Sequence, residues 1–256
     1  MISCLCVTRG RLELLAEAIG DFARQTFADR ELVILHDADD ERHRAIAALA
    51  EAQPGATIRV ERAPAGLRLG GLRTLAVERA RGAWVCQWDD DDRYHPGRLQ
   101  LQWDCAAAEG AAVNYLVDQL HWFCAEALLC WDDWDREPYP MNLIQGTLLA
   151  RRDILPPYPD IPAGEDTAHT HALLRAAAVS GFGVSRLRGA GWCYVYRYHG
   201  GNVWNGAHHR AISLAKHLPP ARLLPRLPAL RERLAEYDAR LPPLRLPIGR
   251  TLQPFP

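Results

Sequence analysis

Short apolar runs alternate with helix-spaced apolar residues along the N-terminal part of the chain. Ile2 to Val7 is an apolar run, and from Leu12 to Ala23 the apolar residues recur at helical spacing. The same alternation predicts strands at 31–36, 57–62 and 83–88, separated by helices at 42–51 and 72–80. This order predicts an α/β fold built on a mainly parallel sheet with helices on both faces.

The pattern becomes less regular after residue 110 and changes again near residue 206. In the middle part we expect a few mixed strands and one helix near 165–178. The aromatic stretch Trp131 to Tyr139 contains three aspartates, which favours a loop over a strand. These changes divide the chain at 1–110, 111–205 and 206–256.

The segment 206–256 differs from the rest of the chain in composition. It holds nine of the 18 prolines, and nine Arg and Lys against three Asp and Glu give it a formal charge of +6. Leu227, Leu230, Leu234 and Leu241 predict one short helix at 227–240, in what resembles an appended Pro/Arg-rich arm. The pattern suits packing on the chain's own domain, a partner subunit in a homo-oligomer, a lipid-linked acceptor, or an anionic membrane surface.

The overall charge of the chain excludes one broad class of partner. The 256 residues contain 30 basic and 31 acidic side chains, and Lys216 is the only lysine. Because these charges nearly cancel, no global field would attract nucleic acid. A hydrophobic content of 48% allows a substantial core. An enzyme acting on small molecules fits better than a nucleic-acid binder.

The cysteines and the N-terminus favour a cytoplasmic protein. Three of the seven cysteines, Cys4, Cys6 and Cys86, lie inside apolar runs and not in spaced pairs, so we expect reduced, buried thiols. The first residues enter a strand pattern directly, without the features of a signal peptide. No stretch is long enough to span a bilayer. Attachment of 206–256 to the inner membrane face would make the protein peripheral.

Polar residues directly follow the predicted strands, and in an open parallel sheet such residues meet at one edge. They are Thr8 and Arg9, then Asp37, then the run Asp89 to Asp92. Four consecutive carboxylates beside an apolar sheet repel one another unless a cation neutralises them. Their position at the end of a strand therefore favours a Mg²⁺ or Mn²⁺ site over a solvated acidic turn.

Five segments, in this order, resemble a known family. After the opening strand come ELVILHDADDE, LGGLRTLAVERARGAWVCQWDDDD, GEDTAHTHALL and YVYRYHGGNVW. Together they resemble the inverting glycosyltransferases of family 2, of the bacterial polysaccharide type, over roughly residues 2–205. The resemblance implies a Rossmann-like GT-A fold in which 1–110 binds the nucleotide sugar and 111–205 binds the acceptor.

The resemblance also implies which residues hold the donor. Asp37 would contact the nucleotide base, although the chain has His-Asp-Ala-Asp where the family has Asp-Asp-Gly-Ser. Arg73 would face the nucleotide or its phosphates. The spacing to the following His-Pro pair selects Asp89 and Asp91 as the D-x-D motif. The implied metal ligands are Asp91, Asp89 and His199, and the implied donor contacts are Thr8, Arg9, Asp37, Arg73, Asp89 and Asp90.

Asp166 would be the general base of the reaction. A carboxylate within hydrogen-bond reach can accept the proton of an acceptor hydroxyl as the new bond forms, and a helix N-terminus favours the ionised carboxylate. Glu165 beside it is the second choice. The alternative interpretation is ordinary helix capping, since acidic residues are common in the first turn of a helix.

Three other functions compete with sugar transfer as interpretations of this sequence. A sugar nucleotidylyltransferase would need a glycine-rich basic loop after the first strand, where the chain has TRGRLELL, and an aspartyl-phosphate phosphatase would need a downstream lysine outside the tail. A non-catalytic module of the same fold, binding a sugar nucleotide or glycan, could dispense with Asp166. Asp37 is compatible with uracil, thymine or guanine, and we expect a UDP-sugar donor. The acceptor, a glycan, a lipid-linked sugar or a small molecule, is left open.

Overall fold

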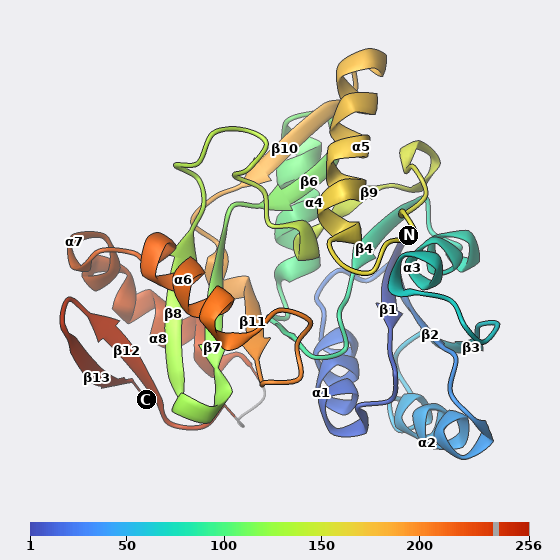
Figure 1. The fold of residues 1–256 in the computed structure, drawn as a ribbon, viewed down its shortest axis with the longest axis horizontal. Helices are drawn as coiled ribbons and strands as arrows, with labels where there is room; N and C mark the ends of the chain where they lie inside the picture. The colour runs from blue at the N-terminus through green and yellow to red at the C-terminus, as the bar shows by residue number, and fades with distance from the viewer. Residues whose placement is uncertain (238–240, 256) are drawn as a thin grey trace.

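The computed structural model describes residues 1–237 and 241–255, which form two β-sheets flanked by helices (Figure 1). The first sheet has the strand order β10-β6-β9-β4-β1-β2-β3. Neighbouring strands are parallel except at β9, which runs antiparallel to β4 and β6. The strands are β1 (Ile2–Val7), β2 (Arg30–His36), β3 (Ile58–Arg62), β4 (Trp84–Gln87), β6 (Ala111–Leu116), β9 (Leu149–Arg151) and β10 (Gly183–Leu187).

The predicted parallel sheet is confirmed. Strands β1 to β4 coincide with the apolar runs of the sequence, and β1 lies between β2 and β4. In the register Val7 pairs with Leu35 and Leu5 pairs with Gln87, so the polar residues that follow these strands share one edge. The division of the chain at residue 110 remains a prediction, and β6, β9 and β10 join the first sheet from beyond it.

The second sheet has the order β13-β12-β8-β7-β11-β5 and carries the last part of the chain. β11 is parallel to β7 and antiparallel to β5, the short strand that directly follows the acidic run. This pairing brings the residues after β11 next to the aspartates. The strands are β5 (Arg93–Tyr94), β7 (Asp118–Phe123), β8 (Leu128–Asp133), β11 (Tyr194–Tyr198), β12 (Leu244–Ile248) and β13 (Thr251–Phe255).

Helices cover the sheets and form several hydrophobic clusters with them. Helix α1 buries Leu15, Ile19 and Phe22 in the main cluster, as its apolar spacing predicts. The α-helices are α1 (Leu12–Ala23), α2 (Asp40–Glu51), α3 (Leu69–Arg79), α4 (Arg98–Ala108), α5 (Glu165–Ser180), α6 (Gly206–Lys216), α7 (Pro220–Leu223) and α8 (Leu227–Ala235). Short 3-10 turns are η1 (Cys124–Glu126), η2 (Gln145–Thr147), η3 (Arg152–Ile154), η4 (Gly191–Cys193) and η5 (Leu224–Arg226).

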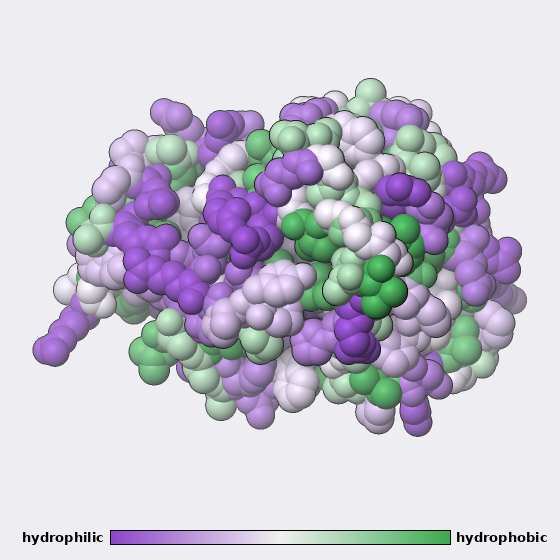
Figure 2. Space-filling model, turned by 90° about the horizontal axis from the view of Figure 1, so that it is seen from above, coloured by the Kyte–Doolittle hydropathy of each residue, from purple (hydrophilic) through white to green (hydrophobic). Residues whose placement is uncertain are grey.

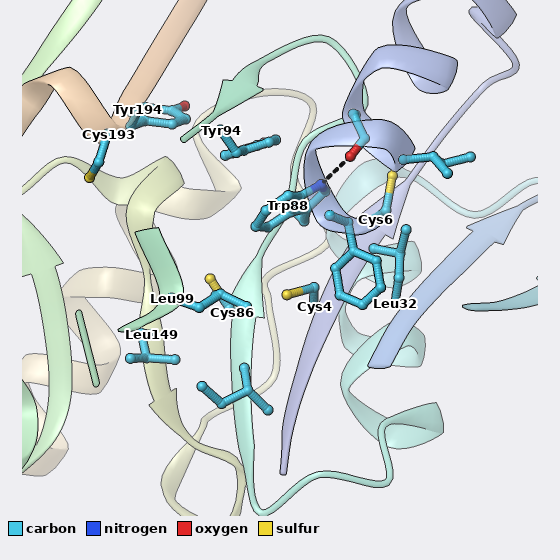
Figure 3. Packing of buried hydrophobic residues seen from close by; sticks show 14 of the residues in the cluster. Cys4, Cys6, Leu32, Cys86, Trp88, Tyr94, Leu99, Leu149, Cys193 and Tyr194 are labelled. Atoms are coloured by element: carbon cyan, nitrogen blue, oxygen red, sulfur yellow. Dashed lines mark hydrogen bonds between the residues drawn. The ribbon is translucent and has the colours of Figure 1, made fainter. Parts of the chain in front are cut away.

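The side chains of the main cluster pack around the end of β4 (Figure 3). The indole of Trp88 donates a hydrogen bond to the carbonyl of Ala18 at 3.0 Å, and its ring stacks on Tyr94 with centroids 3.8 Å apart. Cys4 and Cys6 pack beside it, and all seven cysteines are unpaired, as predicted. Burial raises the pKa of the Cys6 thiol, so this cysteine acts as a neutral apolar side chain.

Two predictions about secondary structure are wrong. The expectation of a loop fails for residues 131–133, which lie in β8; the buried Asp132 is tolerated there because Ser213 donates to its carboxylate at 2.7 Å. Residues 206–255 form helices α6 to α8 and strands β12 and β13 instead of one short helix. Residues 238–240, the end of the predicted helix, lie outside the described residues.

The C-terminal segment packs onto its own domain. Leu230 and Leu234 of α8 are buried in one cluster with Trp131 and Val195 of the second sheet. The apolar side of the helix therefore packs within the chain, which favours packing on its own domain among the interpretations of this segment.

The surface carries scattered hydrophobic side chains between polar ones. Figure 2 shows the face at the top of Figure 1, where hydrophobic residues gather near the middle and hydrophilic ones cover much of the rest. Among the described helices none combines the length and the hydropathy that crossing a bilayer requires.

Candidate functional site

A cavity of about 200 Å³ lies where the two sheets and α5 meet. Its walls come from segments far apart in the sequence: the start of α1, helix α3, the acidic run after β4, the start of α5 and the segment after β11. The lining residues are Val7, Arg11, Leu69, Arg73, Asp89 to Asp92, Gly164, Glu165, Asp166, Tyr196, Gly201, Asn202, Val203 and Trp204. The cavity is therefore at the carboxyl edge of the parallel strands, where the sequence predicts a ligand site.

Asp91 and His199 form the centre of its acidic side. The Nε2 atom of His199 lies 3.1 Å from Oδ2 of Asp91, and both side chains are about 15% exposed. Burial alone would raise the pKa of Asp91, but the hydrogen bond from His199 and the charge of Arg11 outweigh it and lower that pKa. Asp91 is therefore an ionised carboxylate with an imidazole beside it.

Asp90 and Asp92, the neighbours of Asp91 in the chain, are buried. Thr8 donates to Asp90 Oδ2 at 2.6 Å, and Arg11 binds the other oxygen of Asp90. Asp92 accepts from the hydroxyl of Tyr194 at 2.5 Å and from the backbone N–H of Arg197 at 2.9 Å. Burial raises the pKa of Asp90 and that of Asp92, and the charge of Asp91 raises both further. These two aspartates fix the loop that presents Asp91.

Arg73 links the acidic run to α5. Its Nη2 atom lies 3.0 Å from Asp89 Oδ1, and its Nε lies 3.3 Å from Glu165 Oε1. Asp89 also accepts from the amide of Gln87 at 2.9 Å. The pKa of Glu165 is raised by burial, against which the charge of Arg73 acts. Arg73 is thus a buried cation between two carboxylates that come from different parts of the chain.

Asp166 also lines the cavity and lies in the first turn of α5. Gly164 precedes the helix with φ of 76°, a left-handed conformation that favours glycine, and it supplies no side-chain cap. Asp166 Oδ1 accepts from the backbone N–H of Thr167 at 2.7 Å. Asp166 is therefore not the N-cap residue, and it lines the same cavity as Asp91.

The structure gathers most of the predicted site residues, but not all. Arg73, Asp89, Asp90, Asp91 and Asp166 line the cavity, and Thr8 and His199 bond to residues that do. Arg9 is exposed, and Asp37, which follows β2, is half-buried. Neither of these two is among the lining residues of the cavity as drawn from the described part of the chain.

Sequence reasoning missed Arg11, which binds both Asp90 and Asp91. Arg11 stands close behind Thr8 at the same sheet edge, so the end-of-strand rule could have included it. It also missed the contact of Arg73 with Glu165, which joins α3 to a helix far along the chain. No local sequence pattern predicts the contact between Arg73 and Glu165.

Asp91 and His199 fit a single divalent cation. Two neighbouring ligand atoms of one octahedral ion at about 2.1 Å lie roughly 3.0 Å apart, close to the distance between Oδ2 and Nε2. Carboxylate and imidazole are both ligands of first-row divalent metals. Asp89 is less available as a third metal ligand, because its two oxygens accept hydrogen bonds from Arg73 and Gln87.

A second group of metal-ligand types, Cys130, Asp132 and His217, lies away from this cavity. His217 Nδ1 accepts from the backbone N–H of Trp131 at 3.1 Å, and Nε2 donates to the carbonyl of Pro247 at 2.9 Å. Both ring nitrogens are thus engaged with the backbone, so the histidine has no free lone pair for a metal. The group ties β8 to the C-terminal segment.

Comparison with known proteins gives a family match for part of the chain and several similar folds. Residues 3–119 match the model of glycosyl transferase family 2. No curated protein matches the chain. A mannosyltransferase from Pyrobaculum calidifontis, solved in complex with GDP-Man and Mn²⁺, is similar with a TM-score of 0.60 at 14% identity, covering 93% of this chain and 70% of its own.

Residues 1–349 of TarS from S. aureus, solved with UDP-GlcNAc, are similar with a TM-score of 0.59 at 14% identity, covering 94% of this chain and 68% of that one. A longer TarS structure gives a TM-score of 0.57 at 13% identity, and there the match spans 40% of the TarS chain. At such identities the likeness concerns the fold.

Proposed function

We propose that the chain, whose residues 3–119 match the model of glycosyl transferase family 2 and whose fold is similar to that of two solved glycosyltransferases, transfers a sugar from a nucleotide diphosphate to an acceptor hydroxyl, with a divalent cation and with inversion at the anomeric carbon. One observation carries the proposal. Asp91, which His199 contacts, and Asp166 line the same cavity although they come from distant parts of the chain, so a candidate metal ligand and a candidate base share one site.

On the metal side, Asp91 and His199 would hold Mn²⁺ or Mg²⁺. Such an ion supplies charge that stabilises a departing diphosphate. Asp90 and Asp92 act on Asp91 through the loop they fix, because their own carboxylates are bonded to Thr8, Tyr194 and the backbone of Arg197. The proposed donor contacts at the cavity are Thr8, Arg73, Asp89 and Asp90. Arg9 and Asp37 do not line the cavity, so they would contact only a part of the donor that extends beyond it.

On the base side, Asp166 would accept the proton of the acceptor hydroxyl as that oxygen attacks the anomeric carbon. Asp166 lies in the first turn of α5, where the helix dipole favours acidic side chains. A single displacement by an oxygen activated in this way inverts the anomeric configuration. Arg73 holds Glu165, the neighbour of Asp166, and so positions the start of α5 against the donor side.

The donor is proposed to be a UDP-sugar. The similar TarS structure contains UDP-GlcNAc and the similar mannosyltransferase contains GDP-Man with Mn²⁺, so this choice rests on the first of these two structures. Asp37 as the base contact is compatible with UDP but does not select it. A panel of UDP-, TDP- and GDP-sugars decides between the bases.

The proposal is tested by ligand stabilisation followed by turnover. With Mn²⁺ present, the correct nucleotide sugar at 100 times its Kd should stabilise the protein by about 2.7 kcal/mol, and nucleoside diphosphate should be released. Asp91→Asn should lose both effects, whereas Asp104→Asn, an exposed aspartate of α4, should keep them.

Two results would contradict parts of the proposal. If the wild type turns over as fast in EDTA as in Mn²⁺, the metal dependence in the proposal is wrong. Stabilisation by a nucleotide sugar without any release of nucleoside diphosphate, across a panel of acceptors and water, would indicate a binding module instead of an enzyme.

A further inference from the structure

Arg11 occupies an unusual place among the charges of the cavity. Its Nη1 atom lies 2.8 Å from Asp91 Oδ2 and 3.3 Å from Nε2 of His199, and its Nη2 binds Asp90 Oδ1. The guanidinium therefore contacts the very oxygen and nitrogen that the proposed function gives to the metal. Its side chain is 40% exposed, so it has room to leave.

The backbone before α1 aims Arg11 at the carboxylates. Gly10 adopts φ of 83°, a left-handed conformation that favours glycine, and its N–H donates to Thr8 Oγ1 at 2.9 Å. Thr8 in turn donates to Asp90. Asp90 would keep this hydroxyl partner if Arg11 moved away, so the loop does not depend on the guanidinium alone.

A divalent ion on Asp91 Oδ2 and His199 Nε2 would lie within a few ångströms of the Arg11 guanidinium. Two cations at that separation repel each other strongly where the surroundings are partly buried. The same guanidinium also lines the cavity, where it could form charge-assisted hydrogen bonds to phosphate oxygens. A divalent ion on Asp91 would therefore favour the phosphate partners of Arg11 over its carboxylate partners.

We propose that Arg11 is a competing counter-cation: it neutralises Asp90 and Asp91 in the free protein, and it turns to the diphosphate when the divalent ion takes its place. This inference rests on the metal site of the proposed function. Metal and nucleotide binding would then be coupled, because each favours the displaced position of Arg11. The free protein would bind the metal weakly, and the nucleotide complex would bind it tightly.

The experiment measures Mn²⁺ binding by electron paramagnetic resonance, with and without UDP, and does not depend on turnover. Without nucleotide, Arg11→Gln should bind Mn²⁺ about tenfold more tightly than the wild type, and Arg11→Lys should lie between them. With UDP, Arg11→Gln should gain less Mn²⁺ affinity than the wild type gains. Arg44→Gln, which removes an equal charge from the exposed face of α2, is the matched control and should resemble the wild type.

Three outcomes would overturn the inference. If Arg11→Gln binds Mn²⁺ no more tightly than the wild type, while Asp91→Asn abolishes binding, Arg11 does not compete and the metal site of the proposed function stands. If Arg44→Gln tightens binding as much as Arg11→Gln, the effect is one of net charge. If no variant binds Mn²⁺ even with UDP, this inference and the metal part of the proposed function both fail.

Discussion

Replacing Arg73 by Met removes the buried cation that joins the donor side of the cavity to α5, while it keeps an unbranched side chain in the same space. The Arg73 side chain is 12% exposed, Asp89 is 25% exposed and Glu165 is 7% exposed. Asp89 retains the hydrogen bond from Gln87, whereas Glu165 loses a charged partner. The main cost is therefore an uncompensated charge at Glu165.

Removing one partner of a buried ion pair costs about 3–5 kcal/mol. Because Asp89 is partly solvated and has a second partner, we expect the lower end, about 3 kcal/mol at pH 8. A protein of this size changes its Tm by roughly 2–4 °C per kcal/mol, so Tm should fall by about 6–12 °C.

The loss should depend on pH. Burial already raises the pKa of Glu165, and without the opposing charge of Arg73 that pKa rises further. The variant takes up a proton at Glu165 as the pH falls, so its destabilisation should be smaller at pH 5 than at pH 8.

Urea unfolding at pH 5 and pH 8 tests this reasoning on the wild type, Arg73→Met and the double variant Arg73→Met with Glu165→Gln. The double variant should recover at least about 1 kcal/mol at pH 8, because the amide leaves no buried charge. A loss below about 1 kcal/mol in Arg73→Met, or a loss that is the same at both pH values, would refute the assignment of Arg73 as the buried counter-ion of Glu165.

Three further predictions concern stability and the position of α5. Burial, with the charges of His121 and His208, lowers the pKa of His209 to about 4, so the unfolded state binds more protons between pH 6.5 and 4. As the pH falls through that window, His209 should lower the free energy of unfolding by at most about 3 kcal/mol. His209→Phe should make this free energy depend less on pH, and an unchanged dependence would contradict the lowered pKa of His209. Leu230→Ala should cost about 2–5 kcal/mol in urea unfolding, because Leu230 is 1% exposed; a negligible cost would mean that α8 does not pack on its own domain. Gly164→Ala should cost about 1–2 kcal/mol at its left-handed backbone and slow sugar transfer, and unchanged stability would contradict that conformation.

The parts of the fold that the sequence predicts well are those that local patterns determine. Strands β1 to β4 and helix α5 follow from apolar spacing. The position of Asp89 to Asp92 beyond a strand end was enough to place them in a cavity, because parallel strands end at one edge. Asp91 and His199 could be brought together only through the resemblance, since they come from different sheets.

What the sequence did not predict depends on partners far away along the chain. Asp132 is buried in β8 because Ser213 and His121 bond its carboxylate, which a local pattern of aspartates cannot reveal. Strand β12 pairs with its neighbour β13 but also with the distant β8, and pairing between distant segments leaves little local signal. Arg11 resembled any surface arginine until the folded chain brought Asp90 and Asp91 to it.

The most direct test of the central claim is the turnover of Asp166→Asn at saturating nucleotide sugar and Mn²⁺, with a verified acceptor. Asparagine keeps the size of the side chain and can still accept the hydrogen bond from the N–H of Thr167, but it cannot take up the acceptor's proton. The account predicts that transfer falls by about a hundredfold or more while the Kd for the donor and the stability remain near those of the wild type. NMR of the fresh product of the wild type should show inversion at the anomeric carbon. Near-normal turnover of Asp166→Asn, or a retained configuration in the wild-type product, would contradict the proposed displacement across this cavity.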